Sequence, residues 1–160
     1  MSKLYSIKPY TKKDHNEWND FIFESKNGLF IHRREFLEYH LNKLYDTSII
    51  IRKHLSPIAV FPSNSINGEI FSHSGVTFSG LLMSSKLRAS EICEIFQLLI
   101  EYYKSKNYSA IYYKAIPHIF HKLPSEEDLY ALICNGAKVI KRDLSSFNPS
   151  HILIELGGND

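Results

Sequence analysis

The stretch IFSHSGVTFSGLL, residues 70–82, decides the fold expected for the rest of the chain. It follows the turn pair Asn67-Gly68 and opens with apolar residues, a pattern that predicts a strand. Hydroxyls, an imidazole and two glycines then interrupt the pattern, and such residues weaken a strand unless another group approaches its backbone closely. We therefore expect residues 70–82 to form a central strand with a binding edge. The alternative is a bulged strand whose glycines and hydroxyls are purely structural.

Length and composition predict one globular domain that covers residues 1–160. A chain of 160 residues can bury a continuous core. Its hydrophobic fraction of 44% and charged fraction of 22% are typical of soluble globular proteins. The net charge of +2, with the eight histidines counted as neutral, creates no strong field. Charge alone therefore indicates neither a nucleic acid nor an anionic membrane as a partner.

The N-terminal sequence and the cysteines indicate a reducing compartment. MSKLYSIKPY lacks the apolar core of a signal peptide, and no later apolar run reaches the roughly 20 residues of a membrane span. We expect a cytoplasmic protein without a membrane span. Cys93 and Cys134 form no CxxC pair, so we expect two unpaired, at least half-buried thiols. His118 and His121 alone supply too few ligands for a closed metal site, and no metal is expected.

Hydrophobic periodicity predicts the remaining helices and strands. Helical spacing of apolar residues occurs in residues 14–27, 29–45, 90–106 and 125–135. Strand patterns occur in residues 3–8, 48–55, 58–62, 109–117, 137–144 and 151–156, and residues 63–68 form a polar loop. The resulting order is β-α-α-β-β-β-α-β-α-β-β. We expect a mixed α+β (α/β) fold with an open, twisted mixed sheet and helices on its faces.

An acidic run, Glu126, Glu127 and Asp128, opens the last expected helix. Carboxylates are favourable at a helix N-terminus, and Ser125 with Asp128 has the spacing of a capping box. We therefore interpret the run as structural, although Glu126 or Glu127 could still act as a base. The buried face of this helix is expected to be Leu129, Leu132 and Ile133.

The loop MSSKLRAS, residues 83–90, connects the central stretch to the third expected helix. Backbone amides and the helix dipole at such a junction can hold an anion. Lys86 and Arg88 lie in this loop and would add positive charge. Two solvated surface cations are the alternative interpretation.

The chain resembles the GNAT-type acyltransferase fold in its order of elements and in three segments: FSHSGVTFSGLL, YYKAIPHIFHKLPSEEDLYAL and GAKVIKRDLSS. More narrowly, residues 4–147 resemble the FemAB-like subgroup and acetyltransferases of bacterial polysaccharide gene clusters. The resemblance implies transfer of an acyl or aminoacyl group to an amine of a small-molecule, sugar or peptide acceptor. It implies acyl-CoA or aminoacyl-tRNA as the donor, with no permanently bound cofactor and no other nucleic acid.

The chain departs from the GNAT pattern in two respects. MSSKLRAS contains no glycine where typical GNAT enzymes have Q/R-x-x-G-x-G/A, the loop that binds the pyrophosphate of acyl-CoA. FemAB-like proteins usually carry two such domains, whereas this chain resembles the N-terminal half alone. We therefore expect a single GNAT-like domain that acts as a homodimer or pairs with a second GNAT-like domain.

The expected cleft lies where residues 70–82 part from the strand at residues 110–116, beneath His118. Both strands become polar or aromatic at this end, so a pocket can combine apolar walls with a few polar groups. His73 and His118 are the candidate catalytic bases, because an unperturbed histidine titrates near neutral pH; a structural hydrogen-bonding role is the alternative for each. The expected substrate-binding residues are Ser74, Thr77, Ser79, Gly80, Tyr113 and Lys114. The expected donor-binding residues are Leu82, Met83, Lys86 and Arg88.

A non-catalytic half-domain is the competing interpretation. Without a phosphate-binding loop, such a module could dimerise to rebuild a two-domain groove. It could instead recognise a sugar-containing ligand through Tyr112, Tyr113, His73 and the neighbouring hydroxyls.

Overall fold

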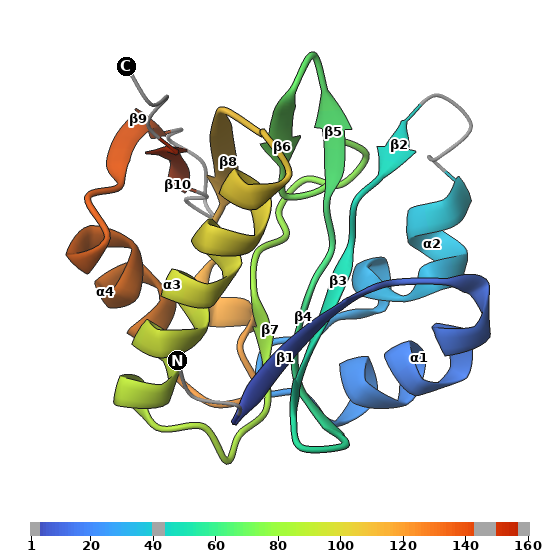
Figure 1. Ribbon diagram of the computed structural model, residues 1–160. Coiled ribbons are helices and arrows are strands. Elements are labelled where there is room, and N and C mark those ends of the chain that lie inside the picture. The colour runs from blue at the N-terminus through green and yellow to red at the C-terminus, as the bar shows by residue number, and fades with distance from the viewer. Residues whose placement is uncertain (1–3, 40–43, 143–149, 157–160) are drawn as a thin grey trace.

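The computed structural model describes residues 4–39, 44–142 and 150–156 (Figure 1). This part of the chain contains the helices α1 (His15–Glu24), α2 (Arg34–Tyr39), α3 (Ala89–Ser105) and α4 (Glu127–Cys134). Its strands are β1 (Tyr5–Pro9), β2 (Tyr45–Asp46), β3 (Ile49–Lys53), β4 (Ser56–Phe61), β5 (Asn64–Ile66), β6 (Glu69–Phe71), β7 (Leu82–Met83), β8 (Ala110–Lys114), β9 (Lys138–Arg142) and β10 (Ser150–Glu155). Within these residues, no helix combines the length and the apolar character needed to cross a membrane.

The strands form two sheets, and the chain passes between them several times. One sheet has the order β1-β3-β4-β7, and the other has the order β2-β5-β6-β8-β10-β9. Helices lie in the passages from β1 to β2 and from β7 to β8. The other three passages, which we call crossings, contain no helix and run from β2 to β3, from β4 to β5 and from β6 to β7. The first two crossings take residues 47–48 and 62–63, whereas the third takes residues 72–81. Along the long third crossing, the chain passes from β6, which lies beside β8, to β7, which lies beside β4.

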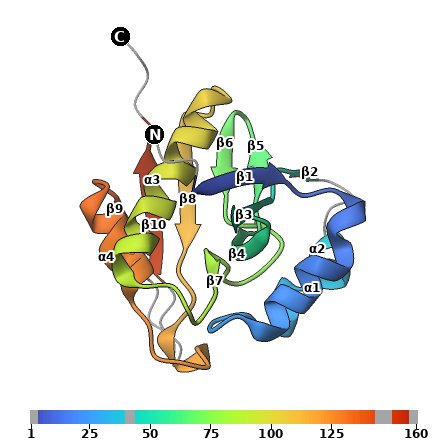
Figure 2. The same cartoon turned by 60° about the horizontal axis from the view of Figure 1, so that its bottom comes forward.

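Helices cover both faces of these strands. Figure 2 shows α1 and α2 on one side of β3, β4 and β7, and α3 and α4 on the other. The three isoleucines of β3 show how strand alternation serves both sides. Ile49 and Ile51 belong to the apolar cluster with α3, whereas Ile50 belongs to the cluster with α1. The expected mixed α+β class and the open mixed arrangement of strands are confirmed.

The expectation of one continuous strand over residues 70–82 is wrong. Only β6 and β7, at the two ends of this stretch, are strands. β6 runs parallel to β8, with Ile70 opposite Ile111 and Phe71 opposite Tyr112. Two residues after Phe71, His73 has a φ of +51°, a left-handed conformation that does not continue a strand. The polar residues and glycines that suggested a binding edge instead mark where the chain leaves the sheet.

Two short strands were not expected from the sequence. β2 precedes β3 directly, and β5 lies within the stretch expected to be a polar loop. β5 and β6 form a hairpin in which Ile66 pairs with Glu69. The turn residues Asn67 and Gly68 have φ values of +51° and +80°, as a two-residue hairpin turn requires. The Asn-Gly pair predicts the turn, but the strand before it is too polar to be predicted from the sequence.

Two details of α3 and α4 correct the sequence interpretation. Both cysteines are unpaired as expected, with Cys93 half-buried, but Cys134 is exposed. Ile133 is also 72% exposed, because α4 turns Ala131 and Leu132 toward the core instead. Parts of the expected elements at residues 3, 40–43 and 143–144 lie outside the described residues.

His32 ties α1 to the third crossing. Its ring is fully buried at the end of the short 3-10 helix η2 (Phe30–His32). Its Nδ1 accepts a hydrogen bond from the Leu29 amide at 3.1 Å, so Nε2 carries the proton that faces the Phe78 carbonyl at 3.3 Å. Its own carbonyl accepts from Trp18 Nε1 at 2.9 Å. Burial lowers the pKa of His32 to about 4, so the ring is neutral in the folded protein.

We expect His32 to make the protein less stable in mild acid. The unfolded chain binds a proton near pH 6.5, and the folded chain does so only near pH 4. Stability is therefore complete above pH 6.5 and falls as the pH drops toward 4, with a slope that approaches about 1.4 kcal/mol per pH unit. Urea unfolding near pH 7 and near pH 5 measures this loss.

The variant His32→Asn is the control for other acid-sensitive groups. The Asn Oδ1 can replace Nδ1 as the acceptor for the Leu29 amide, but the side chain does not titrate. The variant should therefore lose less stability between the two pH values than the parent protein. Equal losses in the two proteins would contradict the assignment.

Candidate functional site

Tyr113 fills the space where β7 and β8 separate. Its ring stacks on Phe61 with centroids 6.1 Å apart and lies 5.8 Å from the ring of Phe96. Its hydroxyl accepts a hydrogen bond from the Leu81 amide at 2.9 Å and donates one to Asp128 Oδ2 at 2.8 Å. We call the space between β7 and β8 the seam. It was expected to hold a ligand, but this one buried side chain fills it.

Gly80 permits this close approach. Its φ is +133°, and a Cβ at this position would lie 2.7 Å from the Tyr113 hydroxyl oxygen. The sequence indicated that some group approaches Gly80 closely. In the structure that group is the side chain of Tyr113, so no space remains for a ligand at Gly80.

Residues 26 and 27 close the outer edge of β7. The side-chain amide of Asn27 donates to the Leu81 carbonyl and accepts from the Met83 amide, each at 2.9 Å. The Lys26 amide donates to the Met83 carbonyl at 2.9 Å. The Met83 amide, a predicted donor-binding group, therefore already has a partner in the protein. Leu82 lies in the ladder with β4, opposite Val60.

A pocket of about 250 Å³ lies at the carboxyl end of β8, and we call it the β8 pocket. The chain enters it through Pro117 and the 3-10 helix η4 (His118–Phe120), and leaves it along α4. Its lining residues are Ala115, Ile116, Pro117, His118, His121, Ser125, Glu126, Asp128, Leu129 and Arg142. Asp128 is only 3% exposed, and burial raises the pKa of its carboxyl group. The pocket thus combines apolar walls with a buried carboxylate and two imidazoles.

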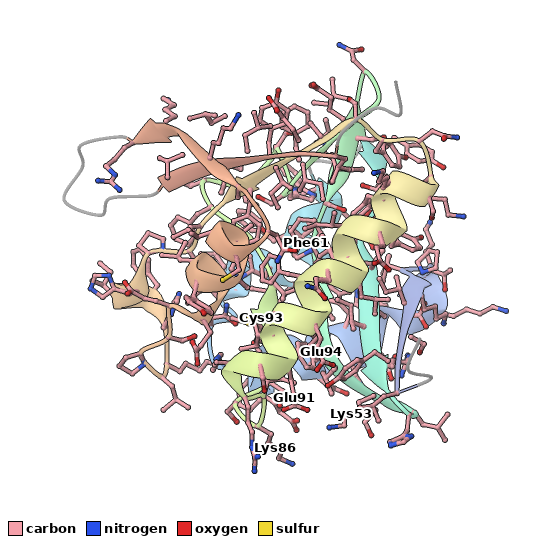
Figure 3. All side chains as sticks on the ribbon, turned by 60° about the vertical axis from the view of Figure 1, so that its left-hand side comes forward. Lys53, Phe61, Lys86, Glu91, Cys93 and Glu94 are labelled. Carbon is pink, nitrogen blue, oxygen red and sulfur yellow. The ribbon has the colours of Figure 1, made fainter. Side chains whose placement is uncertain are left out.

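A larger groove of about 1060 Å³ lies at the start of α3, and we call it the α3 groove. Its walls come from α1, the β3–β4 turn and the loop between β7 and α3. Lys86 and Arg88 line it, and neither forms an ion pair with any other described residue. Figure 3 shows Lys86 at the same end of α3 as Glu91 and Lys53, which pair at 2.7 Å. The groove could bind an anion through these two cations, although four carboxylate side chains line it as well: Glu17, Asp20, Glu24 and Glu91.

The third crossing holds the other predicted site residues. Lys114 Nζ donates to the carbonyls of His73, at 3.0 Å, and of Val76. Burial lowers the pKa of Lys114 to about 8. The Ser79 amide donates to the Lys114 carbonyl at 3.2 Å, which fixes the far end of the crossing. Ser74 and Thr77 are exposed on the same segment, and His73 is fully buried in it.

The structure therefore distributes the predicted site residues over several places. His118 lines the β8 pocket, Lys86 and Arg88 line the α3 groove, and Tyr113 with Gly80 forms the closed seam. Leu82 and Met83 lie in β7. The other predicted residues belong to the third crossing, apart from Lys114, whose side chain holds it. His73 and His118 do not line a common pocket.

Asp128 is the site residue that sequence reasoning missed. The acidic run was interpreted as a helix start with Ser125 and Asp128 as a capping box. In the structure the N-cap of α4 is Glu126, and Asp128 turns inward to accept from the Tyr113 hydroxyl. The signal that could have found it is Tyr113 itself, because a tyrosine in a buried strand needs a partner for its hydroxyl.

No protein-family model matches the chain, and no curated protein is similar to it in sequence. Several solved structures share its architecture. The ribosomal-protein-S18-alanine N-acetyltransferase from Escherichia coli superposes with a TM-score of 0.69 over 98% of this chain and 96% of its own, at 5% identity. An N-acetyltransferase from Staphylococcus aureus Mu50 gives a TM-score of 0.63 over 95% and 97% of the two chains, at 13% identity. The chain has the GNAT fold.

A third similar structure contains a ligand. The protein yncA from Salmonella typhimurium, solved with its cofactor acetyl-CoA, gives a TM-score of 0.55 over 98% of this chain and 96% of its own, at 8% identity. These identities are low, so the similarity establishes the GNAT fold of this chain and leaves its chemistry to be argued from its own residues.

We expect Tyr113→Phe to destabilise the protein by about 1–3 kcal/mol, because it leaves the buried Leu81 amide unsatisfied and removes a donor from Asp128. Urea unfolding monitored by circular dichroism measures this loss. Tyr112→Phe is the matched control, since the Tyr112 hydroxyl makes only a 3.4 Å contact with Glu69. That control should change stability by less than about 0.5 kcal/mol. Equal effects of the two substitutions would show that the Tyr113 hydroxyl does not hold the seam.

Proposed function

We propose that the chain transfers an acyl or aminoacyl group to the amine of a small-molecule, sugar or peptide acceptor. The observation that carries the proposal is a GNAT fold with a buried carboxylate in a pocket at the carboxyl end of β8. Similar structures named above are N-acetyltransferases, one of them for a ribosomal-protein alanine. Another similar structure is a spermidine/spermine N-acetyltransferase from Vibrio cholerae. The finer FemAB-like and polysaccharide-cluster assignment is part of this proposal.

The proposed donor is an acyl-CoA, with an aminoacyl-tRNA as the other candidate. Both donors carry phosphates, which suit Lys86 and Arg88, the two cations of the α3 groove that form no ion pair with a described residue. The first turn of α3 adds backbone amides at the same place. The glycines that would let a phosphate approach the loop backbone more closely are absent, so the two side chains would supply most of the attraction.

The proposed reaction forms a C–N bond and breaks the C–S or C–O bond of the donor. The attacking amine must be neutral and must lose a proton as the product forms. Asp128 is the proposed proton acceptor, because burial raises the pKa of its carboxyl group toward the range in which it can hold a proton. His118, on the exposed side of the β8 pocket, is the proposed donor of a proton to the leaving group.

A non-catalytic binding or assembly module is the second candidate function. The closed edge of β7 favours it, because the Met83 amide is bonded to Asn27 and the Leu81 amide is bonded to Tyr113. Neither amide is then available to stabilise an oxyanion. In this case the chain would act as the N-terminal half of a FemAB-like unit, paired with a second GNAT-like domain or with its own copy.

Calorimetric titration with acetyl-CoA distinguishes the two candidates. We expect the parent protein to bind acetyl-CoA and to release free CoA thiol when a panel of primary amines is added. Lys86→Ala and Arg88→Ala should each weaken acetyl-CoA binding by about tenfold, since each removes one charge-assisted contact. Lys104→Ala, an exposed cation on α3 outside the groove, should leave the affinity unchanged. Absence of both binding and thiol release would refute acyl transfer from CoA and support the module.

A further inference from the structure

We propose that the β8 pocket binds a small amino acid, with its ammonium group at Asp128 and His121 and its carboxylate at Arg142. The amino acid is the acyl acceptor if the proposed function is right, and that role rests on the proposed function. The binding itself rests on four features of the pocket.

The first feature is a buried carboxyl group that forms no ion pair with a described residue. Asp128 Oδ2 accepts from the Tyr113 hydroxyl at 2.8 Å, and Oδ1 accepts from the Leu129 amide at 2.9 Å. No lysine or arginine among the described residues forms an ion pair with it. A buried charge of this kind is costly unless a counter-ion reaches it. An ammonium group in the pocket would supply that counter-ion.

The second feature is an unused acceptor on His121. Its Nε2 lies 3.1 Å from the Ile116 carbonyl, and a carbonyl can only accept, so Nε2 carries the ring proton. The other nitrogen, Nδ1, then holds a lone pair. That atom is buried and has no hydrogen-bond partner among the described residues. A buried acceptor normally has a donor, and an ammonium group offers three N–H bonds.

The third feature is the volume of about 250 Å³. Pockets for drug-sized ligands usually begin at roughly 300 Å³. The β8 pocket therefore suits a small molecule better than a sugar chain or a folded protein segment.

The fourth feature is the guanidinium of Arg142, at the end of β9. Arg142 lines the same pocket, is exposed and forms no ion pair with another described residue. Its fork of N–H donors matches the two oxygens of a carboxylate. A ligand that carries both an ammonium and a carboxylate satisfies Asp128, His121 and Arg142 together.

Four probes distinguish binding of the ammonium group from binding of the carboxylate. They are L-alanine, 4-aminobutanoate, n-propylamine and propionate, each titrated into the full chain and followed by calorimetry and by NMR of the histidine ring nitrogens. We expect at least one of the two amino acids to bind about tenfold more tightly than propylamine or propionate. We also expect the Nδ1 resonance of His121 to move when an amine-bearing probe is added.

Two substitutions test the two ends of the pocket. Asp128→Asn should lose binding of every amine-bearing probe. The Asn side chain can still accept from the Leu129 amide, but its NH2 group then faces the Tyr113 hydroxyl, whose proton loses its acceptor. Circular dichroism and urea unfolding of the variant therefore check that the fold is retained. Arg142→Gln, on the surface, should weaken amino-acid binding but leave propylamine binding unchanged. Glu101→Gln and Lys104→Gln are the matched controls on the exposed face of α3.

The inference is wrong if no probe binds or moves the His121 resonance, or if Asp128→Asn and Arg142→Gln bind the probes as the parent does. Binding without any acyl transfer from acetyl-CoA would support the pocket and refute acyl transfer from CoA. Acyl transfer to amines whose acceptor KM is unchanged in both variants would support the proposed function and refute the pocket.

Discussion

The side chain of Asn27 replaces a missing strand at the edge of β7, and the geometry of the seam depends on it. β7 is only two residues long and pairs with β4 on one side. Its other edge would leave the Leu81 carbonyl and the Met83 amide buried and unsatisfied, at a cost of about 1–3 kcal/mol each. A carboxamide offers one donor and one acceptor in the same plane, so a single side chain satisfies both groups.

The backbone around Asn27 is shaped for this contact. α1 ends at Glu24, and the Ser25 hydroxyl turns back to the Ile22 carbonyl at 2.8 Å. At Gly28 a Cβ would lie 2.5 Å from that same carbonyl, so only glycine lets the chain fold back beside α1. The end of α1 thereby fixes β7, β7 fixes the Leu81 amide, and that amide orients the Tyr113 hydroxyl toward Asp128. Asp128 lines the β8 pocket, so the position of its carboxyl group there depends on this series of contacts.

Sequence patterns predicted the elements whose burial is local and periodic. The face of α3 that carries Ile92, Ile95, Phe96, Leu99 and Tyr103 is buried as expected, because helical spacing alone places these residues together. Asp128 could not be predicted in the same way. Its sequence context fits an exposed helix start equally well, and its burial depends on Tyr113, which reaches it from another element. The break after Phe71 depends likewise on Lys114, whose ammonium group binds the carbonyls of the crossing chain.

The seam and the β8 pocket differ in how completely their polar groups are satisfied. At the seam, the Leu81 and Met83 groups that face outward from β7 all have partners in the protein. In the pocket, Asp128 has a buried carboxyl group that forms no ion pair with the described residues, and His121 keeps an unused acceptor. The chain thus satisfies the backbone groups at the edge of β7 and leaves the carboxyl group of Asp128 without an ion pair among the described residues. On this GNAT fold, the chemistry is therefore better sought at the carboxyl end of β8 than between the strands.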